Sequence, residues 1–123
     1  MVSKKQKNVL GDDIELCCNK PKTGFFRDGF CHTSNQDIGT HVVCVYITDE
    51  FLAYSKSVGN DLTSPNPEIN FPGLSEGDKW CICIMRWKQA LENNVAPPVC
   101  LEATNYKALD YVTLDQLRQN SVH

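Results

Sequence analysis

The chain has 123 residues, of which 41% are hydrophobic and 22% are charged, a balance typical of one globular domain and not of a disordered chain. The net charge of -3 and the pI of about 5.5 exclude a strongly basic protein, so we expect neither a nucleic acid nor an acidic membrane as partner. The one basic cluster, Lys4, Lys5 and Lys7, falls in residues 1–7. We expect this N-terminus to be flexible and residues 8–120 to form a single domain.

The first ten residues contain no apolar core of a secretory signal, and no apolar run approaches the ~20 residues that a membrane-spanning helix requires. We therefore predict a soluble, cytoplasmic protein with no membrane partner. In such a reducing compartment the seven cysteines should be mostly free thiols, and their odd number disfavours a closed set of disulfides.

Regular structure begins late in the chain. Residues 14–18 could form a short strand, but residues 22–40 have the composition of a loop, rich in glycine and small polar side chains. The phenylalanines Phe25, Phe26 and Phe30 give this loop apolar groups to bury, which favours order over disorder.

Residues 41–47 are β-branched and apolar on both faces, which predicts a strand that is covered on both sides. Thr48 can cap the start of a helix, and Gly59 can end it. One face of this helix carries apolar side chains at positions i, i+3 and i+7, namely Phe51, Tyr54 and Val58.

A second long loop, residues 60–78, contains prolines and glycines that disfavour regular structure. The stretch WCICIM, residues 80–85, predicts a second buried strand, and residues from 86 or 87 to 94 predict a helix. Both faces of the strand are apolar: Trp80, Ile82 and Ile84 lie on one, and Cys81, Cys83 and Met85 on the other.

The last third of the chain predicts a third strand at residues 99–103 and a short helix that Thr104 or Asn105 caps. Thr113 should cap a final helix over residues 114–119. These elements indicate an α+β fold in a single compact domain. We expect a three- to five-stranded sheet, two or three helices and two long ordered loops.

Several motifs occur in a fixed order: NVLG, TGFFRDG, EFLAYSKSVGNDL, FPGLSEGDKWCICIMRW, APPVCLEAT and YVTLDQL. Together they resemble a family of small single-domain proteins, mainly bacterial with some eukaryotic members, that is classed only as a domain of unknown function. The resemblance covers about residues 8–117. It implies no activity, substrate or cofactor. Asn105 stands where the family pattern has a histidine, and His32 stands where the family has another polar residue, so neither position supports a shared imidazole ligand.

The side chains that could bind zinc are Cys17, Cys18, Cys31, His32, His41, Cys44, Cys81 and Cys83. Their spacing includes no Cys-x-x-Cys pair. Cys81 and Cys83 share one face of a strand at a separation of about 6.5–7 Å, which is too long for a disulfide. His41 and Cys44 face opposite sides unless a bulge intervenes. We interpret the cysteines as buried structural residues and predict no metal and no cofactor, with a zinc-binding protein as an alternative.

Loops at one end of a rigid sheet are a usual place for a site, and the two long loops could meet there. The candidate pocket residues are Arg27, Asp28, Cys31, His41, Asn60, Asp61 and Asp78. Arg27 could bind a carboxylate or phosphate, or it could hold its loop in shape through an acidic partner. Cys31 is the best candidate for a reactive thiol because a cation such as Arg27 can lower a thiol pKa.

The sequence leaves two classes of function open. The first is a binding module whose 22–40 and 60–78 loops recognise a small molecule or a protein. The second is a small enzyme in which Cys31 or His41 acts beside Arg27 and Asp61.

Overall fold

The computed structural model describes residues 6–19, 22–69 and 71–122. Its regular elements, in chain order, are the strand β1 (His41–Tyr46), the helix α1 (Asp49–Ser57), the 3₁₀ helix η1 (Pro67–Ile69), the strand β2 (Lys79–Cys83), the helix α2 (Ile84–Glu92), the 3₁₀ helices η2 (Leu101–Ala103) and η3 (Tyr106–Asp110), and the helix α3 (Leu114–Gln119). The predicted flexible stretch, residues 1–7, lies mostly outside the described residues, Lys4 and Lys5 included. Gln6 and Lys7 are described, and they bond to Thr33 and Asp13.

The sheet consists of β1 and β2 alone, which pair antiparallel, so the prediction of three to five strands is wrong. The expected third strand, residues 99–103, makes only isolated bridges from Val99 to Val45 and Ser121. Pro97 and Pro98 precede it and have no N–H to donate, and the 3₁₀ helix η2 follows it, so the ladder cannot extend in either direction. Residues 14–18 form no strand either, because their N–H groups bond to scattered partners.

The capping signals in the sequence mark two helices correctly. The Thr48 hydroxyl accepts from the Phe51 N–H at the start of α1, and Gly59, at a φ of 89°, follows the helix end. Thr113 forms a capping box with Gln116 at the start of α3. Three α-helices are present among the described residues, as expected.

The second strand ends two residues earlier than predicted, and α2 begins at Ile84. The reason is the length of its partner: β1 starts at His41, which pairs with Cys83, and beyond that pair only the Ile84 N–H bonds back, to the Thr40 carbonyl. A bulge interrupts the register between His41 and Val43.

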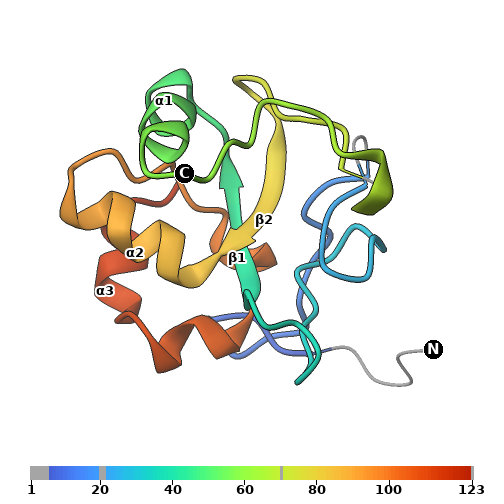
Figure 1. The fold of residues 1–123 in the computed structure, drawn as a ribbon. Helices are drawn as coiled ribbons and strands as arrows, with labels where there is room; N and C mark the ends of the chain where they lie inside the picture. Colours follow the sequence, from blue (N-terminus) through green and yellow to red (C-terminus); the bar gives the residue numbers. More distant parts are fainter. Residues whose placement is uncertain (1–5, 20–21, 70, 123) are drawn as a thin grey trace.

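The three helices lie on one side of the strands and the N-terminal loops on the other (Figure 1). The main core is built from β1, β2 and the inner faces of the helices, with Trp87, Phe51 and Leu117 fully buried. A second cluster, which contains four cysteines, Ile14 and Ala103, lies between the strands and the N-terminal loops. Within the described ranges, the helices are all too short or too polar to cross a membrane.

Candidate ligand-binding pocket

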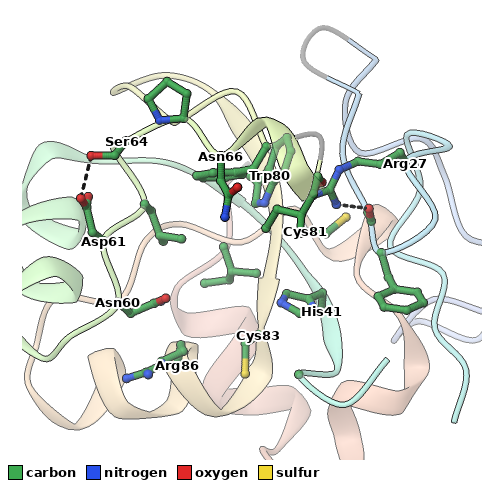
Figure 2. A pocket seen from close by; sticks show the side chains of 18 of the residues that line it. Arg27, His41, Asn60, Asp61, Ser64, Asn66, Trp80, Cys81, Cys83 and Arg86 are labelled. Carbon is green, nitrogen blue, oxygen red and sulfur yellow. Dashed lines mark hydrogen bonds between the residues drawn. The ribbon is translucent and has the colours of Figure 1, made fainter. Parts of the chain in front are cut away.

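A pocket with a cavity volume of about 980 Å³ lies between β2 and the two long loops; we call it the two-loop pocket (Figure 2). Its lining comes from both loops, from β2 and from the start of α2. The lining residues used below are Phe26, Arg27, His41, Asn60, Asp61, Ile69, Phe71, Trp80, Ile82, Cys83 and Arg86. The size is at the upper end of the range for small-molecule sites, about 300–1,000 Å³.

The apolar part of the pocket is built on Trp80 of β2. The rings of Trp80 and Phe71 form a T-shaped pair at a centroid distance of 5.5 Å, which helps to fix the orientation of the indole. Phe26 and Ile69 remain 42% and 58% exposed, one from each loop. An apolar surface of this kind, open to solvent and next to charged groups, is typical of a binding site.

Arg27 joins the two loops. Its guanidinium donates to the Gly24 carbonyl at 2.6 Å and to the Ile69 carbonyl at 2.8 Å, and it lies 5.3 Å from the centre of the Trp80 ring. Its backbone φ of 54° is one that residues other than glycine rarely adopt, so these contacts hold the residue in a costly conformation. Burial lowers the pKa of Arg27, but a guanidinium stays charged at neutral pH.

His41 is held by a buried carboxylate. Its Nδ1 lies 2.7 Å from Asp37 Oδ1, and the side chain of Asp37 is fully buried while that of His41 is 41% exposed. The second Asp37 oxygen accepts from the His41 N–H and from Thr33 Oγ1. The imidazole also packs on Gly39, where an added Cβ would lie 2.4 Å from the ring. An imidazole fixed in this way presents its other nitrogen, Nε2, in a set orientation.

Asp61 lines the pocket, but its carboxylate is engaged within its own loop. It accepts from the Thr63 hydroxyl and N–H and from the Ser64 hydroxyl, and these bonds, those of Thr63 first, lower the pKa of Asp61 far below its usual value. Asn60 is half-buried beside it. Arg86, from the first turn of α2, completes this side, and its Nη1 donates to Gln89 Oε1 at 3.3 Å.

Three of the predicted pocket residues lie outside the pocket lining: Asp28, Asp78 and Cys31, of which Cys31 is described in the next paragraph. Asp78 accepts from the Ser75 N–H and shapes the turn before β2. Asp28 accepts from the Phe30 N–H and lies 2.8 Å from His32 Nδ1, which places it in the N-terminal loop and outside the pocket lining. The structure therefore brings together Arg27, His41, Asn60 and Asp61, and separates them from Asp28 and Asp78.

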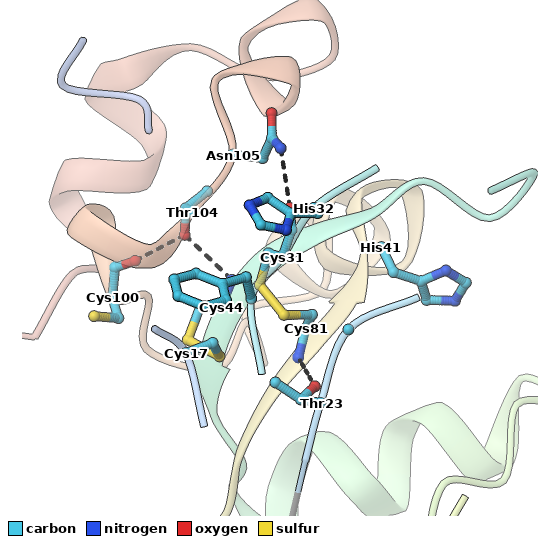
Figure 3. Close-up of a disulfide and its surroundings, with 12 residues drawn as sticks. Cys17, Thr23, Cys31, His32, His41, Cys44, Cys81, Cys100, Thr104 and Asn105 are labelled. Carbon is cyan, nitrogen blue, oxygen red and sulfur yellow. Dashed lines mark hydrogen bonds between the residues drawn. A yellow bond between two sulfur atoms is a disulfide. The ribbon is translucent and has the colours of Figure 1, made fainter. Parts of the chain in front are cut away.

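Cys31 is fully buried and bonded to Cys81, and Cys17 is bonded to Cys44 (Figure 3). The prediction that the cysteines are mostly free thiols is therefore wrong for four of the seven, and Cys31 is not an accessible reactive thiol. The argument against a disulfide between Cys81 and Cys83 agrees with the structure, because Cys83 is free. The free cysteines are Cys18, Cys83 and Cys100, each half-buried.

The position that departs from the family pattern, Asn105, has a structural role. Its amide donates to Gln6 Oε1 and to the Cys31 carbonyl, and its oxygen accepts from the Lys107 N–H at the start of η3 (Figure 3). His32 is also buried: it stacks on Phe30, and its Nε2 has no hydrogen-bond partner in the part of the chain that the structure describes.

Three pocket features were missed by reasoning from the sequence: Asp37, Trp80 and Arg86. Asp37 precedes His41 by four residues in a loop, where no helical period predicts contact. The sequence predicts Trp80 in the core, and its exposed fraction of 5% agrees with that prediction. Trp80 nevertheless also lines the pocket. Arg86 lies in the first turn of α2 because this helix begins earlier than expected, at Ile84, and from there it lines the pocket.

Comparison with known proteins gives one family. The family described as an uncharacterized protein conserved in bacteria (DUF2237) matches residues 7–121. This match confirms the resemblance that the motifs indicate. No curated protein matches the chain.

Proposed function

The chain belongs to the DUF2237 family, whose description assigns no activity, and we therefore propose a function from the two-loop pocket itself: it binds a small organic anion that carries a flat apolar group. This proposal favours a small molecule over a protein as the partner, in the cytoplasmic setting that the sequence suggests.

The balance of charge in the pocket supports an anion. Among the described lining residues, the charged side chains are Arg27, Arg86 and Asp61, with His41 between them. The carboxylate of Asp61 accepts three hydrogen bonds within its own loop and stays ionised, but the two guanidiniums outnumber this one negative charge. Two guanidiniums offer planar donor groups suited to a carboxylate or a phosphate.

The aromatic side of the pocket supports a flat apolar group next to the charge. Trp80 and Phe71 make a fixed wall, and the exposed Phe26 can cover a ligand from the opposite loop. The observation that carries the proposal is the position of the Arg27 guanidinium on the Trp80 ring, where charge and aromatic surface meet and both loops are joined.

The experiment is a titration of the full chain with phenyl phosphate and phenylacetate, and with benzyl alcohol as the uncharged probe. Heteronuclear NMR would follow the indole N–H signal of Trp80. The chain's other tryptophan, Trp87, is buried and donates its indole N–H to the Pro97 carbonyl, so its signal should not respond to a ligand in the pocket. We expect saturable binding of at least one anion. Arg86→Gln should weaken it about ten- to a hundredfold, the usual effect of losing a charge-assisted hydrogen bond. The matched control is R118Q on the exposed face of α3.

Equal shifts with benzyl alcohol, or equal affinity in R86Q and R118Q, would contradict an anion site. Shifts confined to residues outside the two loops and β2 would contradict this pocket as the place of binding.

A second candidate is an enzyme that uses His41 as a general base. The observation in its favour is the buried Asp37, which holds Nδ1 and so directs Nε2. Cys83 is the register partner of His41 across the sheet, next to the bulge between His41 and Val43, and both residues line the pocket. We expect His41→Gln to abolish any hydrolysis of 4-nitrophenyl esters by the wild type. Activity that survives in H41Q would exclude this role.

A further inference from the structure

We propose that Cys17, Cys31, Cys44 and Cys81, the four cysteines of the two disulfides, form a tetrathiolate zinc site when the disulfides are reduced. This inference does not depend on the two-loop pocket or on the function proposed for it.

The sulfur positions carry the proposal. The Sγ atoms of Cys17, Cys31 and Cys81 lie within 4.8 Å of one another, although Cys17 is bonded to neither of the other two. In a tetrahedral zinc site with Zn–S bonds of about 2.3 Å, the sulfurs are about 3.8 Å apart. The sulfur of Cys44 lies outside this set of three, but Cys44 is bonded to Cys17 and is the register partner of Cys81 between β1 and β2, so it is the cysteine placed to supply the fourth ligand once its bond to Cys17 opens.

The backbone around the cluster is fixed by bonds that do not involve sulfur. The Cys44 N–H donates to Thr104 Oγ1, the Cys81 N–H to Thr23 Oγ1, and the Cys17 N–H to the Gly29 carbonyl. The Asn105 amide holds the carbonyl of Cys31 (Figure 3). These contacts do not depend on the disulfides, so the backbone of the four cysteines should keep its position when the disulfides open. A preformed ligand set of this kind is what a metal site requires.

The burial of the cluster determines the type of site. All four cysteines are at most 3% exposed, and Ile14 and Ala103 pack around them. Thiolates in such a space need a cation, because isolated buried charges are costly. A site with four protein ligands and no open position is structural and not catalytic. Zinc would therefore hold the N-terminal loops on the sheet, as the disulfides do in the oxidised protein.

The reaction balances with a dithiol as reductant. Two dithiol molecules each become a disulfide and together transfer four electrons and four protons to the two protein disulfides. The four thiols that result lose their protons when Zn²⁺ binds. A reducing compartment would favour this form, and an oxidising one the disulfides.

The test uses the full chain, purified with dithiothreitol and without chelator. We expect one equivalent of zinc per chain by elemental analysis, and four cysteines that resist alkylation until a chelator is added. Oxidation should release the zinc. Cys31→Ser should lose most of the metal, whereas Cys18→Ser, which changes a free cysteine next to the cluster in sequence, should keep it.

Reduced wild type without zinc, or C31S with as much zinc as C18S, would overturn the proposal. If C31S does not fold, Co²⁺ binding to the reduced wild type decides: the absorption of tetrahedral cobalt with four thiolates supports the site. A spectrum with fewer thiolates, or none, overturns it.

Discussion

The two-loop pocket and the cysteine cluster meet at neighbouring residues of one strand, yet they are built by opposite means. Trp80 and Ile82 line the pocket, whose polar groups are exposed or half-buried and held by hydrogen bonds. Cys81, between them in sequence, also lines the pocket, but its sulfur belongs to a cluster that is closed to solvent and held by covalent bonds. Cys81 is therefore the residue at which the two regions meet.

Because hydrogen bonds hold one region and covalent bonds the other, the two regions should respond to different conditions. The pocket depends on charge and on loop contacts, so it should respond to ligands and to pH. The cluster contains no hydrogen-bonded charged group and depends on the redox state of sulfur. Changes in one region that leave the other intact would support this division, and coupling between them would contradict it.

The largest expected effect is on the cluster side. In the oxidised protein, the double variant C31A/C81A should lower the free energy of unfolding by about 4 kcal/mol. The double variant C17A/C44A should lower it by about 3.5 kcal/mol, because the bond that it removes closes a shorter loop. The sequence separations are 50 and 27 residues. Denaturation in guanidinium without reductant measures both values.

The control for this experiment is the double variant C18A/C83A, which removes two free cysteines. A loss no larger than that of the control would mean that the disulfides do not stabilise the fold. If the C17A/C44A variant, which changes no residue of the pocket lining, also loses its affinity for phenyl phosphate, the pocket and the cluster are coupled.

Local signals predicted the helices, because a cap and a helical face involve residues close in sequence. Thr48, Gly59 and Thr113 each mark a helix end in the structure. The third strand could not be judged in the same way. Its pairing depends on whether β1 has a free edge at the right place, and the two prolines before Val99 limit it to a bridge.

The disulfide pairing could not be predicted from the sequence for a related reason. Cys17 and Cys44 are distant in the chain, and seven cysteines allow many pairings that spacing alone does not order. Of the seven candidate pocket residues, Arg27, His41, Asn60 and Asp61 line one cavity, and that this cavity binds a ligand stays a prediction. Asp37 was missed because its contact with His41 arises from a turn between Asp37 and Thr40, which has no periodic pattern.

The smallest expected effect is on the pocket side and concerns pH. The bonds from Thr63 and Ser64 lower the pKa of Asp61 below its usual value of 3.8, so its carboxylate binds protons less readily in the folded chain. The contribution of Asp61 to the order of its loop is therefore fully present above pH 3.8 and is lost only as the pH falls well below it.

The Thr63 amide signal and its hydrogen exchange, followed by NMR from pH 5 downward, measure this. We expect the Thr63 amide to stay protected at pH 3.8 in the wild type. In Asp61→Asn, which has no carboxylate to titrate at this position, the protection of Thr63 should not change with pH in this range. Glu76→Gln, an exposed carboxylate in the same loop, should leave the Thr63 profile unchanged. A Thr63 signal that titrates at the usual value would mean that the Asp61 contacts do not persist in solution, so that this part of the pocket wall is not held by them.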